Sequence, residues 1–184
     1  IKSVRGSDPN AAVYWLAKML YAGEDPRFIA RRLIILASED IGNADPHGLL
    51  VAVAAKEAVE FVGMPEARII LSQATTYLAT APKSNASYLA IEKAYSDVKE
   101  GRVLPVPAHL RDTHYRGAEK LGHKGYRYAH DFDGHFVDQE YVPTDKVYYA
   151  PTDQGYEESL RRRLEAWRAR RKAAGPGAGG GSES

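Results

Sequence analysis

Apolar residues recur at helical spacing through the first hundred residues. The first such stripe, typical of an amphipathic helix, consists of Ala12, Trp15, Leu16, Met19 and Leu20. Four further stretches at about 26–41, 46–62, 65–82 and 84–100 repeat this spacing or are apolar on most sides. The stretch from 65 carries no charge between Arg68 and Lys83, so we expect it at the buried centre. The pattern predicts an all-α fold with a bundle of about five helices over residues 1–100.

The expected helices begin and end at recognisable signals. Asp-Pro pairs stand at 8–9, 25–26 and 45–46, each directly before a helix-patterned run. An Asp side chain accepts hydrogen bonds from the first turn, and Pro at the first helical position loses none. Gly23 and Gly42 follow the first two runs, where glycine commonly ends a helix.

The periodicity stops at Gly101. Residues 101–155 are rich in Pro, Gly and Tyr, and we expect an ordered loop region that wraps the bundle, because so many aromatic rings are costly to leave in water. A final helix is expected over 156–174, followed by a flexible Gly-rich tail at 175–184. We therefore expect residues 1–174 to form a single domain.

Composition excludes several classes of function. The 25 basic and 24 acidic residues nearly cancel, so net charge predicts no nucleic-acid or membrane partner. The chain has no cysteine, which rules out disulfides and thiolate chemistry within it. Its longest uncharged run, Ile69–Pro82, is shorter than the roughly 20 residues that span a bilayer. Because the chain opens at Ile1 in polar sequence, we expect it to be a piece of a longer protein.

Six short blocks follow one another in an order that one protein family shares. They read GSDPNAAVYWLAKML (6–20), ASEDIGNADP (37–46), TYLATAPKSNA (76–86), LPVPAHLRD (104–112), GHKGYRYAHD (122–131) and YAPTDQGYE (149–157). Here the sequence resembles the C-terminal region of the replication-associated recombination protein A (MgsA) family of AAA+ ATPases, to which the eukaryotic Werner-helicase-interacting ATPase is related. The resemblance covers roughly residues 2–168, and six ordered blocks are far more specific than any one motif.

The resemblance implies a helical module similar to the C-terminal collar of clamp-loader subunits. It implies a homotetramer, upstream ATPase domains that bind ATP and magnesium, and action on DNA in replication-fork maintenance and recombination. Replication proteins such as single-strand-binding protein would be partners through the parent protein, in the bacterial cytoplasm at the nucleoid and not at a membrane. The family-signature residues expected to have structural or interface roles are Glu39, Asp40, Gly42, Asp45, Pro46, Gly125, Tyr126, Tyr128, His130 and Asp131.

No catalytic, cofactor-binding or metal-binding residue is predicted in this chain. A phosphate-binding loop needs GxxxxGK[S/T], and the nearest approach, Gly122–Gly125, lacks the glycine spacing and the hydroxyl. Glu39 and Asp40 are adjacent on a helix and point about 100° apart, so they rarely converge on one atom. We expect them to cap helices or to pair with arginines of neighbouring helices or of a partner subunit. Replacing Asp40 by Ala should then loosen packing or assembly.

A weaker alternative is a metal site in the loop region. His123, His130 and His135, with Asp131 and Asp133 among them, are the right residue types, but their spacing fits no zinc pattern. Hydrogen-bonded histidines and turn aspartates explain them more simply.

The final helix is strongly basic. Its cations, Arg161, Arg162, Arg163, Arg168, Arg170, Arg171 and Lys172, outnumber three glutamates. They favour either a solvated helix end, with Glu157–Arg161 and Glu158–Arg162 as ion pairs one turn apart, or a surface that contacts DNA phosphates.

Two hypotheses follow, with an independent enzyme as a weak third. The first is an assembly module that joins identical chains, through the exposed parts of the first two helices or the aromatic loop. The alternative is a DNA- or protein-binding appendage that recruits the ATPase through its basic final helix.

Overall fold

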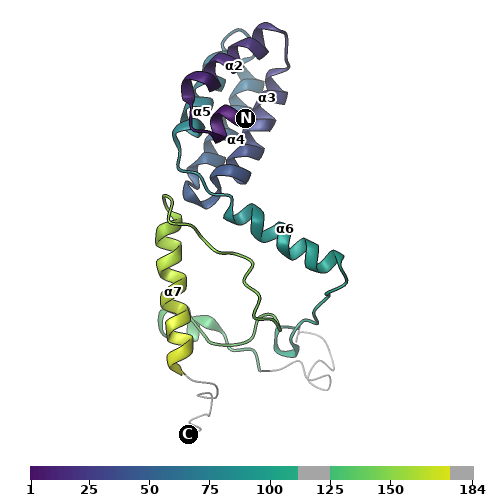
Figure 1. The fold of residues 1–184 in the computed structure, drawn as a ribbon, viewed down its shortest axis with the longest axis vertical. Helices are drawn as coiled ribbons and strands as arrows, with labels where there is room; N and C mark the ends of the chain where they lie inside the picture. The colour runs from purple at the N-terminus through teal and green to yellow at the C-terminus, as the bar shows by residue number, and fades with distance from the viewer. Residues whose placement is uncertain (112–124, 175–184) are drawn as a thin grey trace. The chain divides into compact units, whose positions relative to one another are not determined.

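The computed structural model describes residues 1–111 and 125–174, which divide into two compact units. Unit 1 comprises Ile1–Ala94 and Tyr148–Arg162. Unit 2 comprises the described residues of Tyr95–Val147 and of Arg163–Ser184. The described part of the chain is helical and contains no strand, as predicted (Figure 1). The predicted wrapping of the bundle by residues 101–155 stays a prediction.

Seven α-helices occur in the described residues. They are α1 (Lys2–Arg5), α2 (Pro9–Tyr21), α3 (Pro26–Leu36), α4 (His47–Val62), α5 (Ala67–Thr80), α6 (Ala86–Lys99) and α7 (Glu157–Ala174). Helices α2 to α6 correspond to the five predicted from periodicity, and α7 to the predicted final helix. The short α1 was not predicted. None of the helices in the described residues combines the length and apolar character that a membrane crossing needs.

Two of the three Asp-Pro pairs start helices by the expected mechanism, whereas at the third pair α4 begins one residue after Pro46. The side chain of Asp8 accepts a hydrogen bond from the backbone N–H of Ala11 at 2.9 Å, and Asp25 accepts one from Arg27 at 2.9 Å. Pro9 and Pro26 occupy the first helical positions. In both helices the Asp side chain therefore binds a first-turn N–H that has no partner within the helix, and the Pro removes no helical hydrogen bond.

The core of unit 1 lies between α2, α3, α4 and α5. Helix α5 packs against α1, α2, α3 and α4, as its predicted central position requires. Its buried positions are Ala67, Leu71, Ala74, Thr75, Leu78 and Ala79. The prediction was incomplete in one respect, because Ile69 of α5 is 64% exposed. Small residues of α4 permit close packing: Ala52 is fully buried, and a Cβ on Gly48 would lie 3.2 Å from Ile41 Cγ2.

Helix α6 forms as predicted but adds little to the core. The spacing predicts one apolar side at Tyr88, Ile91, Tyr95 and Val98, and these side chains are exposed in the described structure. Periodicity predicts that a helix has an apolar side; it does not identify the surface that covers that side.

Unit 2 is mostly irregular chain with three short 3-10 turns at Ala108–Leu110, Ala129–Asp131 and Asp133–His135. Its aromatic rings make specific contacts. The ring of Phe136 stacks on Trp167 at a centroid distance of 5.8 Å, and Arg127 lies over Phe132 at 4.6 Å. The buried carboxylate of Asp97 is held by Lys146 at 2.5 Å and Arg102 at 3.3 Å. These contacts order the loop region without regular hydrogen-bonded strands.

Candidate functional site

The SEDIGNADP segment (residues 38–46) begins with a widened helical turn. Helix α3 passes directly into a π-helical turn at Ala37–Ile41, in which Ala37 and Ile41 are buried. Gly42 then reverses the chain with φ 51° and ψ −133°, and a Cβ there would lie only 3.0 Å from the carbonyl oxygen of Ser84. A single π-turn often re-aims side chains at functional positions. Here it brings the acidic pair and residues 43–45 against the segment that precedes α6.

The acidic pair binds an arginine of α1. Arg5 donates from Nε to Asp40 Oδ1 at 2.6 Å and from its terminal nitrogen to Glu39 Oε1 at 3.4 Å. The hydrogen bond to Asp40 and its charge raise the pKa of Arg5. The backbone carbonyl of Asp40 accepts a hydrogen bond from the N–H of Ser84 at 2.8 Å. Asp40 therefore ties both α1 and the start of α6 to the end of α3.

Asp45 connects two other elements. Its Oδ1 accepts from the N–H of His47 at 3.1 Å, at the start of α4, and its Oδ2 accepts from the Tyr77 hydroxyl of α5 at 2.7 Å. The hydrogen bond to Asp45, with burial, raises the pKa of Tyr77. Pro46 is exposed and begins the turn into α4.

Next to this turn lies a cluster of polar side chains from three distant parts of the sequence. We call it the polar junction, and its members are Asn43, Ser84, Tyr149, Thr152 and Glu157. Glu157 is fully buried, at 0% exposure. Its carboxylate accepts hydrogen bonds from Ser84 Oγ (2.6 Å), from the N–H and Oγ1 of Thr152 (both 2.8 Å) and from the Tyr149 hydroxyl (3.0 Å).

These donors decide the charge of Glu157. Burial favours the neutral form, but the hydrogen bonds from Ser84, Thr152 and Tyr149 together outweigh it and hold the pKa of Glu157 below its ordinary value. Asn43 completes the cluster by donating to Ser87 Oγ at 3.2 Å and to the Tyr149 hydroxyl at 3.3 Å. The polar junction therefore holds a buried carboxylate in its ionised form.

Backbone contacts beside the polar junction also join the turn before α4 to the start of α7. The N–H of Tyr156 donates to the carbonyl of Ala44 at 2.8 Å, just before α7 begins. Gly155 adopts φ +51°, and a Cβ at this position would lie 2.2 Å from that carbonyl oxygen and 2.7 Å from Pro82 Cγ. Three of the six sequence blocks (37–46, 76–86 and 149–157) thus meet at one place. The arrangement positions helices and engages the Glu157 carboxylate fully in hydrogen bonds.

Sequence reasoning was wrong about Glu157. We predicted an ion pair between Glu157 and Arg161 one turn later, but Glu157 is buried in the polar junction and Arg161 is exposed. The companion pair, Glu158 with Arg162, is confirmed. Ser84, Tyr149 and Thr152 were not predicted as site residues. The available signal was that all three lie in the matched blocks, together with Glu157.

The loop block at 122–131 is described from Gly125 onward, in unit 2. Gly125 has φ +94°. Exposed side chains follow it, and the ring of His130 stands 5.0 Å from that of Tyr128 and 4.7 Å from that of His135. Asp131 is exposed. Residues 122–124, including His123 of the metal alternative, lie outside the described residues, and within the described ones no group of three metal-ligating side chains forms.

The arginines of α7 differ in their surroundings. Arg162 pairs with Glu158, and Arg171 pairs with Asp138 at 2.7 Å and lies over the ring of Phe136. Arg170 places its guanidinium beside Gly134. The remaining arginines of α7 are exposed, and within the described residues they form no ion pair or hydrogen bond. They are Arg161, Arg163 and Arg168. The Lys172 side chain lies outside the described part of the chain.

Comparison with known proteins agrees with these blocks. The model of the family described as MgsA AAA+ ATPase C terminal matches residues 6–168. An AAA domain-containing protein of Mycobacterium tuberculosis is 57% identical over 173 residues, which are 92% of this chain and 38% of that protein. Replication-associated recombination protein A of Bacillus subtilis is 46% identical over 162 residues, 86% of this chain and 38% of that protein. ATPase WRNIP1 of Dictyostelium discoideum is 45% identical over 146 residues, 77% of this chain and 16% of that protein.

The match spans most of the chain and includes all three blocks that meet at the polar junction. The chain belongs to the MgsA AAA+ ATPase C-terminal family. It spans about two fifths of the length of the M. tuberculosis and B. subtilis proteins, each of which it covers to 38%.

Proposed function

We propose that this chain is the assembly module of a AAA+ ATPase and joins identical copies into a homotetramer. The observation that carries the proposal is the apolar surface of unit 1. Its core is complete, yet large apolar side chains remain in water, among them Tyr21 at 96% and Phe61 at 92% exposure. Large apolar side chains that stay exposed beside a complete core mark surfaces that other proteins cover.

The names of the relatives support the cellular process in which this assembly would act. The B. subtilis relative is named replication-associated recombination protein A, and the M. tuberculosis relative carries an AAA domain. We infer that the parent protein binds ATP and magnesium in domains outside this chain. There it acts on DNA in replication-fork maintenance and recombination, in the bacterial cytoplasm, together with proteins such as single-strand-binding protein. In this proposal the 184-residue chain brings those ATPase domains together and has no catalytic step of its own.

The test is the mass of the 184-residue chain in solution. Size-exclusion chromatography with light scattering, at about 5 to 100 µM protein, should give four times the single-chain mass of 20.3 kDa. Apolar association should persist when salt rises from about 0.1 to 1 M, because charge screening leaves apolar burial intact. A monomer at the highest concentration contradicts the proposal.

The unpaired arginines of α7 favour a second candidate, a DNA-binding appendage. Removing one phosphate-binding cation should lower the slope of log affinity against log salt by about 0.9 for duplex DNA. Changing Arg161, Arg163 and Arg168 together to Gln should therefore lower it by about 2.7. The matched control removes three exposed cations elsewhere, Lys18, Arg68 and Lys93. Fluorescence anisotropy with labelled DNA at a series of salt concentrations measures the slope for both variants, and equal reductions in slope contradict a role for α7.

A further inference from the structure

Helices α3 and α4 form one exposed face of the bundle. The two helices pack against each other, and both turn their other sides to the core. On α4, Leu50, Val53, Glu57 and Phe61 recur every three or four residues and so form one stripe along the helix. Leu50 is 64% exposed and Phe61 is 92% exposed. Ile35 of α3 adds a further exposed apolar side chain at 41%.

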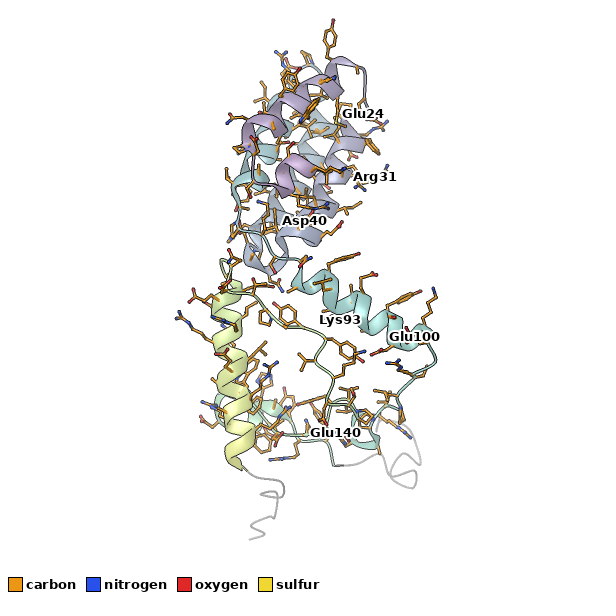
Figure 2. All side chains as sticks on the ribbon, in the orientation of Figure 1. Glu24, Arg31, Asp40, Lys93, Glu100 and Glu140 are labelled. Atoms are coloured by element: carbon orange, nitrogen blue, oxygen red, sulfur yellow. The ribbon has the colours of Figure 1, made fainter. Side chains whose placement is uncertain are left out.

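The α3 side of this face is basic. Arg31 is exposed and lies over the ring of Phe28 at 5.3 Å, and Figure 2 shows it on the outer side of α3. Within the described residues it forms no ion pair, although its charge, after the hydrogen bonds from Arg27, helps to lower the pKa of the Asp25 carboxylate. Arg27, on the same helix, pairs with Asp25 at 3.2 Å. Arg27 and Arg31 thus share one carboxylate, and the α3 side keeps an excess of positive charge.

The α4 side is acidic. The side chain of Glu57 is 70% exposed. Lys56 lies 2.8 Å from Glu60 but 3.5 Å from Glu57, so it compensates Glu60 more closely. An excess of negative charge therefore remains around Glu57, on the same face as Arg31. We use the name α3–α4 face for Arg31, Ile35, Leu50, Val53, Glu57 and Phe61.

A face with a basic side and an acidic side can bind a copy of itself. Two-fold rotation places α3 of one copy against α4 of the other, and the reverse, so each charge meets its opposite twice. We propose that the α3–α4 face binds the same face of a second copy of this chain, with the Arg31 of each copy opposite Glu57 of its partner. Leu50, Val53 and Phe61 would be buried between them. This assignment rests on the proposed assembly function.

The size of the face suits one interface of a larger assembly. Two helices packed about 10 Å apart span a width of about 20 Å, and the 16-residue α4 is about 24 Å long. The flat footprint of about 500 Å² per copy, or about 1,000 Å² for the pair, lies at the lower limit expected of a specific interface and below the standard size of about 800 Å² per partner. We therefore assign this face one of the interfaces of the proposed tetramer.

The groove between α2 and α5 is the main competing surface. It has a volume of about 590 Å³ and an apolar lining that includes Tyr21, Met64 and Ile69. Among the described residues that line it, Arg68 is the one charged side chain. Two-fold pairing of this groove would bring like charges together, so it lacks the self-complementarity of the α3–α4 face.

Charge reversal tests the pairing of Arg31 with Glu57. Arg31→Glu alone and Glu57→Arg alone should each reduce the mass of the 184-residue chain to half or less of the wild-type value. The double variant should return to the wild-type mass, and so should an equimolar mixture of the two single variants, because opposite charges again face each other. If the double variant and the mixture both stay dissociated, the pairing is wrong. Arg68→Glu is the matched control and should keep the wild-type mass.

Apolar substitution tests the surface independently of charge pairing. Leu50 and Ile69 are equally exposed, at 64%, on helices of the same bundle. Leu50→Lys should reduce the mass to half or less, whereas Ile69→Lys should leave it unchanged. The opposite result would move the interface to the α2–α5 groove and overturn the inference while leaving the assembly function intact. A wild-type chain that is itself monomeric would overturn the assembly function as well.

Discussion

At the scale of single residues, Glu157 shows how the fold uses a buried charge. A carboxylate is costly to remove from water unless donors replace the water. Ser84, Thr152 and Tyr149 supply four hydrogen bonds to it. The same carboxylate thereby links the start of α7 to the segment before α6 and to residue 149. The loss of this one side chain would leave several polar groups without partners.

We expect Glu157→Ala to lower the free energy of unfolding by about 3 kcal/mol, because buried Ser84 and partly buried Thr152 and Tyr149 all lose their acceptor. Urea denaturation followed by circular dichroism measures the change. Glu158→Ala is the matched control, since its carboxylate is half-exposed and pairs only with Arg162. Its expected cost is about 0.5 kcal/mol. Equal costs for the two variants would show that the polar junction does not stabilise the fold.

The polar junction also predicts how stability depends on pH. The folded chain holds the pKa of Glu157 below its ordinary value of 4.5, so the unfolded chain takes up the proton first as pH falls. The stabilisation should be complete above about pH 5.5 and should decline below about pH 4.5. We expect the difference in unfolding free energy between wild type and Glu157→Gln to shrink over that range. Denaturation curves from pH 7 to pH 3 test this, and a constant difference would contradict it.

At the scale of elements, the turn into α7 depends on Gly155. An alanine there would adopt the left-handed conformation and place its Cβ against the Ala44 carbonyl. We expect Gly155→Ala to cost at least about 3 kcal/mol of unfolding free energy, as a backbone clash added to the left-handed penalty. Gly23→Ala is the control, because Gly23 has φ +86° with no atom within 4 Å of the added Cβ. It should cost only about 1–2 kcal/mol, and urea denaturation should resolve the difference.

Helices were more predictable from the sequence than their contacts. Periodicity and the Asp-Pro signals predicted α2 to α5 and their order, since both are local properties. The π-turn at Ala37–Ile41 was not predicted, because five residues of π-helix have no distinct apolar pattern. The burial of Glu157 was not predicted either. Its partner Ser84 lies 73 residues away, and local spacing instead favoured a surface pair with Arg161.

At the scale of the whole molecule, assembly should make thermal stability depend on concentration. Association stabilises the folded chain by mass action, and a tenfold rise in concentration contributes about 1 kcal/mol per chain to a tetramer. For this chain length that corresponds to a rise in Tm of roughly 2–4 °C. Differential scanning fluorimetry at about 2, 20 and 200 µM measures it. Leu50→Lys should show a smaller dependence, and a constant wild-type Tm would contradict assembly.

The polar junction also has a consequence for the order of folding. Its hydrogen bond between Asn43 and Tyr149 joins residues 106 positions apart. Closing a loop of that length costs about 4 kcal/mol of chain entropy, whereas the contacts of α4 with α3 and with α5 close much shorter loops. During synthesis the first four helices leave the ribosome before Tyr149 exists. We therefore expect the junction to form last on the folding pathway, so that changes at Glu157 accelerate unfolding and leave the folding rate nearly unchanged.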